Sequence, residues 1–184
     1  MAPHGDQVTI AQAQADVRRV YSGGWGGPAV AAVVWLAAGL TAGAVDVPTG
    51  ATVLFLGGAV LIFPANLLLN RLLSGHADLP AGHPMRGLAI QSAATMAVML
   101  LALWLLAPHL PAAFFPLAMI AVGSHYFPFT HLYGDPTFLV SGAVQTAAGL
   151  LLLMMGLGDL AAYVMAGLLV AMSITLAVRR RGHT

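Results

Sequence analysis

Six stretches of this chain are apolar, free of charged side chains, and close to the length that crosses a lipid bilayer. They cover residues 28–45, 51–70, 87–107, 110–130, 137–157 and 160–178. A helix rises 1.5 Å per residue, so about 20 residues span the roughly 30 Å hydrocarbon core. Because lipid offers no hydrogen-bond partner to an open strand, and no alternating barrel pattern occurs, we expect helices. The predicted fold class is an all-α membrane protein, a bundle of six transmembrane helices.

The composition excludes a water-soluble globule. Hydrophobic residues make up 59% of the chain and charged residues 7%, against about 45–50% and 25% in soluble domains. Such a chain in water would expose large apolar patches. The net charge of +1 gives no electrostatic reason to bind nucleic acid, so the expected partners are the lipid bilayer, a second copy or another membrane protein, and a small-molecule ligand. The absence of cysteine excludes disulfides and thiolate metal sites.

The basic residues predict the orientation. All are arginines, and six crossings place them on one side of the membrane: Arg18, Arg19, Arg71, Arg86, Arg179, Arg180 and Arg181. Positive charge is retained in the cytoplasm, so both termini are expected there. The predicted organisation is a cytoplasmic N-terminal segment (1–27), one transmembrane domain (28–178) and a basic cytoplasmic tail (179–184).

The N-terminal segment carries a helix signal of its own. Thr9 and Gln12 fit a capping box. Apolar side chains follow at helical spacing, namely Ile10, Ala13, Val17, Val20 and Tyr21. This pattern predicts a short helix. The preferred interpretation is a solvated lead-in whose arginines hold the terminus inside, and the alternative is an interfacial element that lies on the membrane surface or docks a partner. A third interpretation is a signal peptide cleaved after Ala44, which would leave five spans.

Uncharged polar side chains recur four residues apart inside three stretches, so each pair shares one helix face. The pairs are Asn66 with Asn70, Gln91 with Thr95, and Ser141 with Gln145. The fourth stretch adds His125 and His131. An amide that faces lipid loses hydrogen bonds worth roughly several kcal/mol, so we expect these faces to point inward, in the cytoplasmic half of the bundle.

Two interpretations of this polar set remain open. The simpler is interhelical hydrogen bonding, worth about 0.6 kcal/mol per pair. The other is a cytoplasm-facing vestibule that binds or carries a polar or amphiphilic small molecule, which Pro64, Pro116 and Pro128 favour because they free backbone carbonyls. Its candidate ligand-binding residues are Asn66, Asn70, Gln91, Thr95, His125, His131, Ser141 and Gln145. A structural or accessory subunit that packs through glycine faces such as Gly39–Gly43 is the alternative function.

The histidines give little support to metal chemistry. His125 and His131 are six residues apart, about 120° around a straight helix, whereas helical metal ligands prefer a spacing of three or four. Asp135 stands between Gly134 and Pro136, which favours a helix cap over a ligand. We therefore expect no enzyme and no cofactor, and an intramembrane metal-dependent hydrolase using His125, His131 and Asp135 is the second alternative.

Several short segments together carry a resemblance to a known family. They are Arg18–Tyr21, Phe55–Gly58, Phe63–Pro64, His83–Pro84, Phe114–Pro116 and Leu132–Gly134. In these segments the chain resembles a family of small bacterial multi-pass integral membrane proteins of unknown function. The resemblance implies a location in the bacterial cytoplasmic (inner) membrane and no established chemistry.

Overall fold

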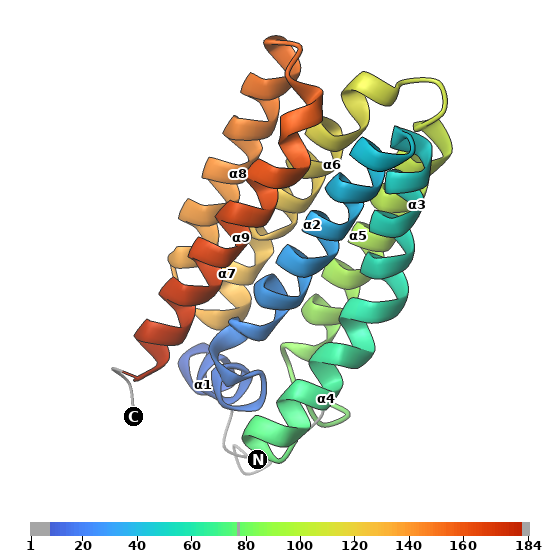
Figure 1. Cartoon of the computed structure of the whole chain (residues 1–184). Helices are drawn as coiled ribbons and strands as arrows, with labels where there is room; N and C mark the ends of the chain where they lie inside the picture. Colours follow the sequence, from blue (N-terminus) through green and yellow to red (C-terminus); the bar gives the residue numbers. More distant parts are fainter. Residues whose placement is uncertain (1–7, 77, 182–184) are drawn as a thin grey trace, which may run out of the picture.

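The computed structural model describes residues 8–76 and 78–181, and within these ranges it contains helices and loops but no strand (Figure 1). Residues 1–7 of the predicted N-terminal segment and 182–184 of the predicted tail lie outside the described residues. The helices are α1 (Ile10–Val20), η1 (Ser22–Gly24), α2 (Gly26–Ala44), α3 (Val47–Leu56), η2 (Gly57–Leu61), α4 (Ile62–Ser74), α5 (Arg86–Leu106), α6 (Pro111–His125), α7 (Phe127–Tyr133), α8 (Thr137–Met154) and α9 (Gly158–Arg181). The all-helical prediction is confirmed.

Five helical segments are long and apolar enough to cross a membrane. They are α2, α5, α6 with α7, α8 and α9. The predicted stretch 51–70 is instead divided among α3, the π-helical segment η2 and α4. Pro64 explains the interruption, because proline has no N–H and its ring clashes with the carbonyl four residues earlier, which lies in η2. By length and composition alone, five helical segments of the described chain could each cross a membrane, and the predicted stretch 51–70 is not among them.

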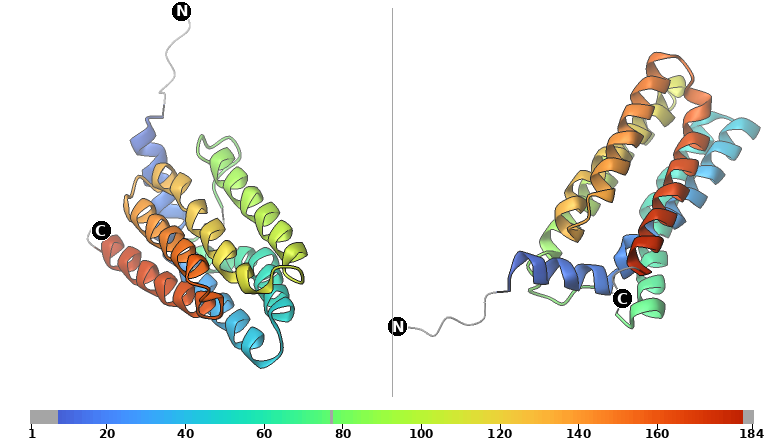
Figure 2. Two further views of the ribbon diagram at one scale, coloured as in Figure 1. Left: turned by 90° about the horizontal axis from the view of Figure 1, so that it is seen from above. Right: turned by 90° about the vertical axis from the view of Figure 1, so that its left-hand side faces the viewer.

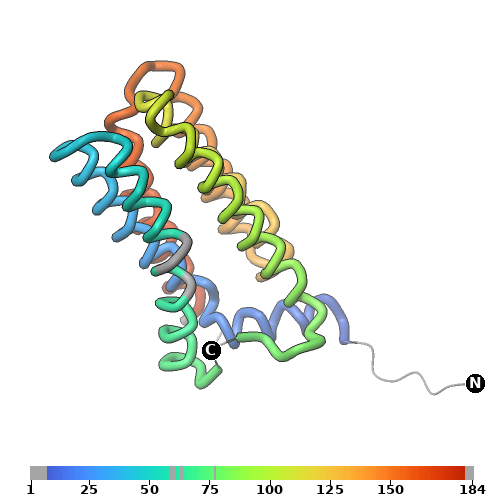
Figure 3. The backbone as a smooth tube through the Cα atoms, turned by 90° about the vertical axis from the view of Figure 1, so that its right-hand side faces the viewer, coloured from blue at the N-terminus to red at the C-terminus, as the bar shows by residue number. Residues whose placement is uncertain are grey.

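The helices form two layers (Figure 2). In one layer α2 lies between α9 and the α3–η2–α4 segment, and in the other α6 lies between α8 and α5. The most extensive contacts join α6 with α8 and α2 with α9. Figure 3 shows α1 lying across one end of both layers. The start of α2 and the end of α9 meet at this end, where the Ser173 hydroxyl donates to the Trp25 carbonyl at 2.9 Å.

Glycines set the closest helix crossings. A Cβ on Gly142 would lie 2.6 Å from the Gly123 carbonyl oxygen, so α6 and α8 touch backbone to backbone. Between α2 and α9, a Cβ on Gly39 would lie 2.9 Å from Ala162, and the Tyr163 hydroxyl donates to the Gly39 carbonyl at 3.0 Å. Gly39 therefore packs inside this chain. It belongs to the glycine face that was predicted, as one alternative, to pack against another protein.

The predicted N-terminal helix is present as α1. Both hydrogen bonds of the capping box form, since the Thr9 hydroxyl accepts from the Gln12 amide and the Gln12 side chain accepts from the Thr9 amide. The helix is anchored to the bundle, because the Gln14 side chain donates to the His131 carbonyl at 2.7 Å and Arg18 donates to the Tyr133 carbonyl. These bonds to the end of α7 distinguish α1 from a solvated lead-in.

Candidate functional site

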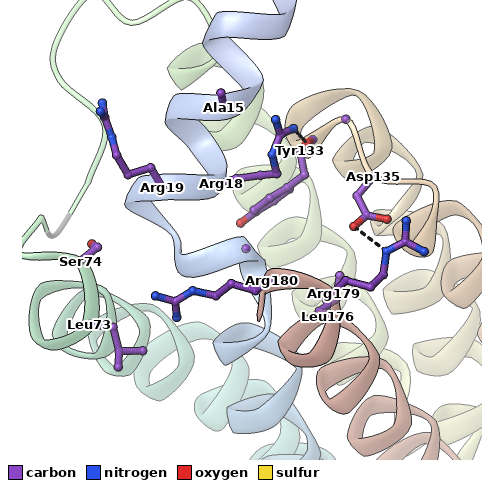
Figure 4. Close-up of a pocket in the computed structure, with 12 residues that line it drawn as sticks. Ala15, Arg18, Arg19, Leu73, Ser74, Tyr133, Asp135, Leu176, Arg179 and Arg180 are labelled. Atoms are coloured by element: carbon purple, nitrogen blue, oxygen red, sulfur yellow. Dashed lines mark hydrogen bonds and ion pairs between the residues drawn. The ribbon is translucent and has the colours of Figure 1, made fainter. Parts of the chain in front are cut away.

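A pocket of about 610 Å³ opens at the end of the bundle that α1 crosses (Figure 4). Its walls come from α1, η1, α4, the turn between α7 and α8, and the end of α9. The lining residues are Ala15, Arg18, Arg19, Gly23, Leu73, Ser74, Tyr133, Gly134, Asp135, Leu176, Arg179 and Arg180. Four arginines and a single carboxylate line it, so the pocket carries an excess of positive charge. We call it the arginine pocket.

The turn between α1 and α2 brings the arginines together. Arg18 and Arg19 occupy the last turn of α1, where the partial negative charge of a helix C-terminus favours cations. Ser22, Gly23 and Gly24 follow, each with positive φ, and turn the chain from α1, which lies across the end of the bundle, up into α2 (Figure 3). A Cβ on Gly24 would lie 2.9 Å from the rings of Tyr133 and Phe138, so only glycine fits there. This turn places the end of α1 beside the end of α9.

The arginines differ in how far they are neutralised. Arg179 forms an ion pair with Asp135 at 3.4 Å, and Arg19 forms one with Asp16 at 2.7 Å. Arg18 is held by the carbonyl of Tyr133. Arg180 forms no hydrogen bond or ion pair with residues 8–76 or 78–181, and Figure 4 shows its side chain extending toward Leu73 and Ser74. The Arg180 guanidinium is thus the group most available to an incoming anion.

One wall of the pocket is aromatic and rigid. The Tyr133 ring stacks on Phe138 with centroids 4.6 Å apart, and the Tyr21 ring lies 6.4 Å from Tyr133. The Tyr21 hydroxyl donates to the Asp78 carboxylate, which ties the loop before α5 to α1. Burial, followed by this hydrogen bond, raises the pKa of Tyr21 above its ordinary value. These contacts fix the backbone that carries Arg18 and Arg19.

The chemistry of the lining suits an anionic headgroup. A guanidinium binds phosphate or carboxylate through two parallel N–H donors, and such charge-assisted hydrogen bonds are about twice as strong as neutral ones. Leu73 and Leu176 supply apolar surface beside the arginines. Basic pockets between helices at a membrane interface are typical binding sites of acidic lipid headgroups.

The polar residues predicted to bind a ligand do not line the arginine pocket. Asn70 and Gln145 are buried in the bundle, whereas Asn66 and Ser141 are half-buried. The Asn66 amide donates to the Ile62 carbonyl of its own helix at 2.9 Å. Gln145 is 1% exposed, and its amide nitrogen lies 3.7 Å from the Met172 sulfur. No hydrogen bond joins two of the predicted ligand-binding side chains within the described residues, so direct bonding between them is not what holds these helices.

The inward orientation expected for Gln91 and Thr95 is wrong. Both are exposed on α5, and Ser92 is buried in their place, with its hydroxyl 3.1 Å from Nδ1 of His125. The buried stripe of α5 includes Ser92 and Leu100, and Gln91 is one position, about 100°, away from Ser92 around the helix. The i, i+4 spacing showed that the pair shares a face but not which face it is.

The predicted metal ligands are not brought together. His125 packs edge-on against Phe129 with centroids 4.7 Å apart, whereas His131 is exposed. Asp135 was expected to cap the helix, but Pro136 holds the N-cap position of α8, and Asp135, one residue before it, accepts a hydrogen bond from the Thr137 amide at 2.8 Å. Across residues 8–76 and 78–181, no three His or Asp side chains lie close enough to share a metal ion.

The comparison with known proteins adds the family. The model of a family of unknown function, DUF7010, matches residues 10–179. The chain belongs to the DUF7010 family. The matched region begins at the first residue of α1 and includes Arg18, Arg19 and Arg179 of the pocket. Searches of curated proteins and of solved structures found no match.

Proposed function

We propose that this DUF7010 protein is a six-span protein of the bacterial cytoplasmic membrane that binds an anionic amphiphile in the arginine pocket, with both termini in the cytoplasm. The proposal has two parts, the threading of the chain and the ligand. The observation that carries it is the gathering of Arg18, Arg19, Arg179 and Arg180 around one pocket with a single carboxylate on its wall.

The pairing of α2 with the α3–η2–α4 segment supports six crossings. A Cβ on Gly50, in the first turns of α3, would lie 2.6 Å from the carbonyl oxygen of Ala38 near the end of α2. At the opposite end, a Cβ on Gly26 would overlap the Leu69 side chain. The Ser74 hydroxyl donates to the Val20 carbonyl at 2.8 Å. The interrupted segment therefore runs antiparallel to α2 along its whole length, as a second span would.

The position of the arginines supports the cytoplasmic orientation. Arg18, Arg19, Arg179 and Arg180 surround the pocket at one end of the bundle, and Arg71 and Arg86 flank the loop that is tied to α1 through Tyr21. Cytoplasmic loops of membrane proteins carry such an excess of arginine and lysine. The pocket then faces the inner leaflet and the cytoplasm.

The ligand we infer is a phosphate or carboxylate headgroup carried on an apolar tail. The headgroup would accept hydrogen bonds from Arg180 and Arg19, and the tail would lie along Leu73 and Leu176. This location replaces the polar vestibule as the preferred site of an amphiphile. A vestibule around Asn70 and Gln145 stays a prediction.

The test compares two arginines of equal charge. Detergent-solubilised full-length protein is titrated with short-chain phosphatidic acid. Arg180→Gln is expected to weaken binding about tenfold or more, because it removes one charge-assisted hydrogen bond worth about 1.5–3 kcal/mol. Arg71→Gln removes the same charge from exposed α4 outside the pocket and should change affinity less than twofold. Equal weakening by both variants would mean general surface attraction and would refute the pocket. Inorganic phosphate serves as the second probe, and binding as tight as that of phosphatidic acid would refute the amphiphile.

A further inference from the structure

Helix α5 lies at the edge of its layer and keeps most of its surface outside the bundle. Its outer face carries exposed residues at alternating spacings of four and three, and we call this row the seam. The seam residues are Gly87, Gln91, Ala94, Val98, Leu101 and Leu105. This is the heptad spacing of a helix that packs along a second helix. Val98 is 66% exposed and Leu105 60% exposed, so the seam has no partner within the described part of the chain.

The seam includes polar groups at membrane depth. Gln91 lies in it and Thr95 beside it, and neither side chain forms a hydrogen bond with residues 8–76 or 78–181. Thr41 and Thr175, in other apolar helices, donate to the carbonyl four residues earlier at 2.9 and 2.8 Å. Gln91 and Thr95 are five and nine residues from the start of α5, about 7.5 and 13.5 Å along the helix. Polar groups inside the hydrocarbon core cost free energy unless a neighbour satisfies them.

We propose that this seam is the interface of a homodimer in which α5 of one copy packs in parallel against α5 of the other. Copies inserted with the same orientation are related by an axis along the membrane normal, so identical residues meet at identical depth. The Gln91 amide both donates and accepts hydrogen bonds, and it therefore complements itself across such an axis. A different protein would need a matching polar group at the same depth, whereas a second copy supplies one by symmetry.

The remaining seam residues fit this occupant. Gly87 and Ala94 stand on either side of Gln91 and let two backbones approach closely. Val98, Leu101 and Leu105 continue the seam with apolar side chains that fill the space between helices. A single polar residue in an otherwise apolar seam fixes the register of paired helices. The inference rests on the membrane threading proposed above but not on the arginine pocket.

Because the chain contains no cysteine, single-cysteine variants test the dimer directly. Val98→Cys is placed in the seam, Met99→Cys about 100° around the same helix, and Val140→Cys on the exposed face of α8, where Val140 is 61% exposed. Membranes are oxidised with copper phenanthroline, and the products are separated without reductant. We expect V98C to form a disulfide dimer of twice the chain mass, and M99C and V140C to stay mostly monomeric.

A second variant tests the role of the amide. Gln91→Leu in the cysteine-free chain should raise the dissociation constant of the dimer in detergent about threefold to tenfold, the usual range for one interhelical hydrogen bond. An unchanged constant would refute the amide contact. Three results would each refute the homodimer. They are the absence of a V98C dimer, equal amounts of dimer at all three positions, and a V98C adduct with a protein of different mass. Ala94→Cys, a second seam position, must behave as V98C does.

Discussion

The crossing of α6 and α8 makes Gly142→Ala a sharp test of the packing. The added Cβ would lie 2.6 Å from the Gly123 carbonyl oxygen, whereas ordinary contacts begin at 3.4 Å, so the two backbones must separate by about 0.8 Å. A gap of this size forfeits roughly a quarter to a half of the dispersion energy of the contacts it opens. The expected loss is about 1–3 kcal/mol of unfolding free energy.

Gly167→Ala is the matched control. Gly167 lies on α9 with no atom within 4 Å of the added Cβ. Replacing a helical glycine by alanine normally gains about 0.5–1 kcal/mol. Thermal unfolding of both purified variants in one detergent should lower Tm by about 2–10 °C for G142A and raise it by about 1–4 °C for G167A. If G142A were as stable as the unsubstituted protein, or if both variants shifted in the same direction, the backbone contact between α6 and α8 would be wrong.

Two further substitutions probe the core and the base of the bundle. Gln145→Leu should stabilise the protein by about 1 kcal/mol, because the buried Gln145 side-chain oxygen has no hydrogen-bond partner within the described residues. A lower Tm together with weaker binding of phosphatidic acid would instead place Gln145 in a ligand vestibule. The raised pKa of Tyr21 means that folding favours the neutral phenol, so this stabilisation is complete below the ordinary pKa of 10.0 and declines as the pH rises above it. Tyr21→Phe should therefore flatten the fall in Tm between about pH 10 and 12, and an unchanged slope would show that another group causes it.

The sequence predicts the helices well because their signals are local. Apolar runs without charge identify α2, α5, α8 and α9 to within a few residues, and the capping box identifies α1. The π-helical interruption at η2 follows from Pro64, yet the run of apolar residues from 51 to 65 continues through η2 without a charged residue. Counting hydrophobic residues therefore does not reveal the change in backbone geometry at η2.

The candidate site was predicted less well, because it depends on contacts between distant helices. The arginines predicted an orientation, but their meeting in one pocket requires α2 to pack on α9 and α1 to lie across the end of the bundle. The turn from α1 into α2 uses Ser22 with positive φ, a conformation that serine rarely adopts. For Gln91, the sequence gives the spacing but not the rotation of α5. The sequence did contain one indication of the arginine pocket, since Arg18 and Arg179 flank the first and last spans on the same predicted side of the membrane.

Cysteine accessibility at three exposed positions tests the central claim, six crossings with the arginine pocket on the cytoplasmic side, most directly. Thr49→Cys lies in the first turn of α3, and His76→Cys and His109→Cys lie in the connections before and after α5, so each places a single exposed thiol at a successive end of the bundle in the cysteine-free chain. In intact bacterial cells, a membrane-impermeant maleimide should label T49C and H109C, and it should label H76C only after the membrane is opened. Labelling of H76C in intact cells, or protection of T49C, would contradict the account.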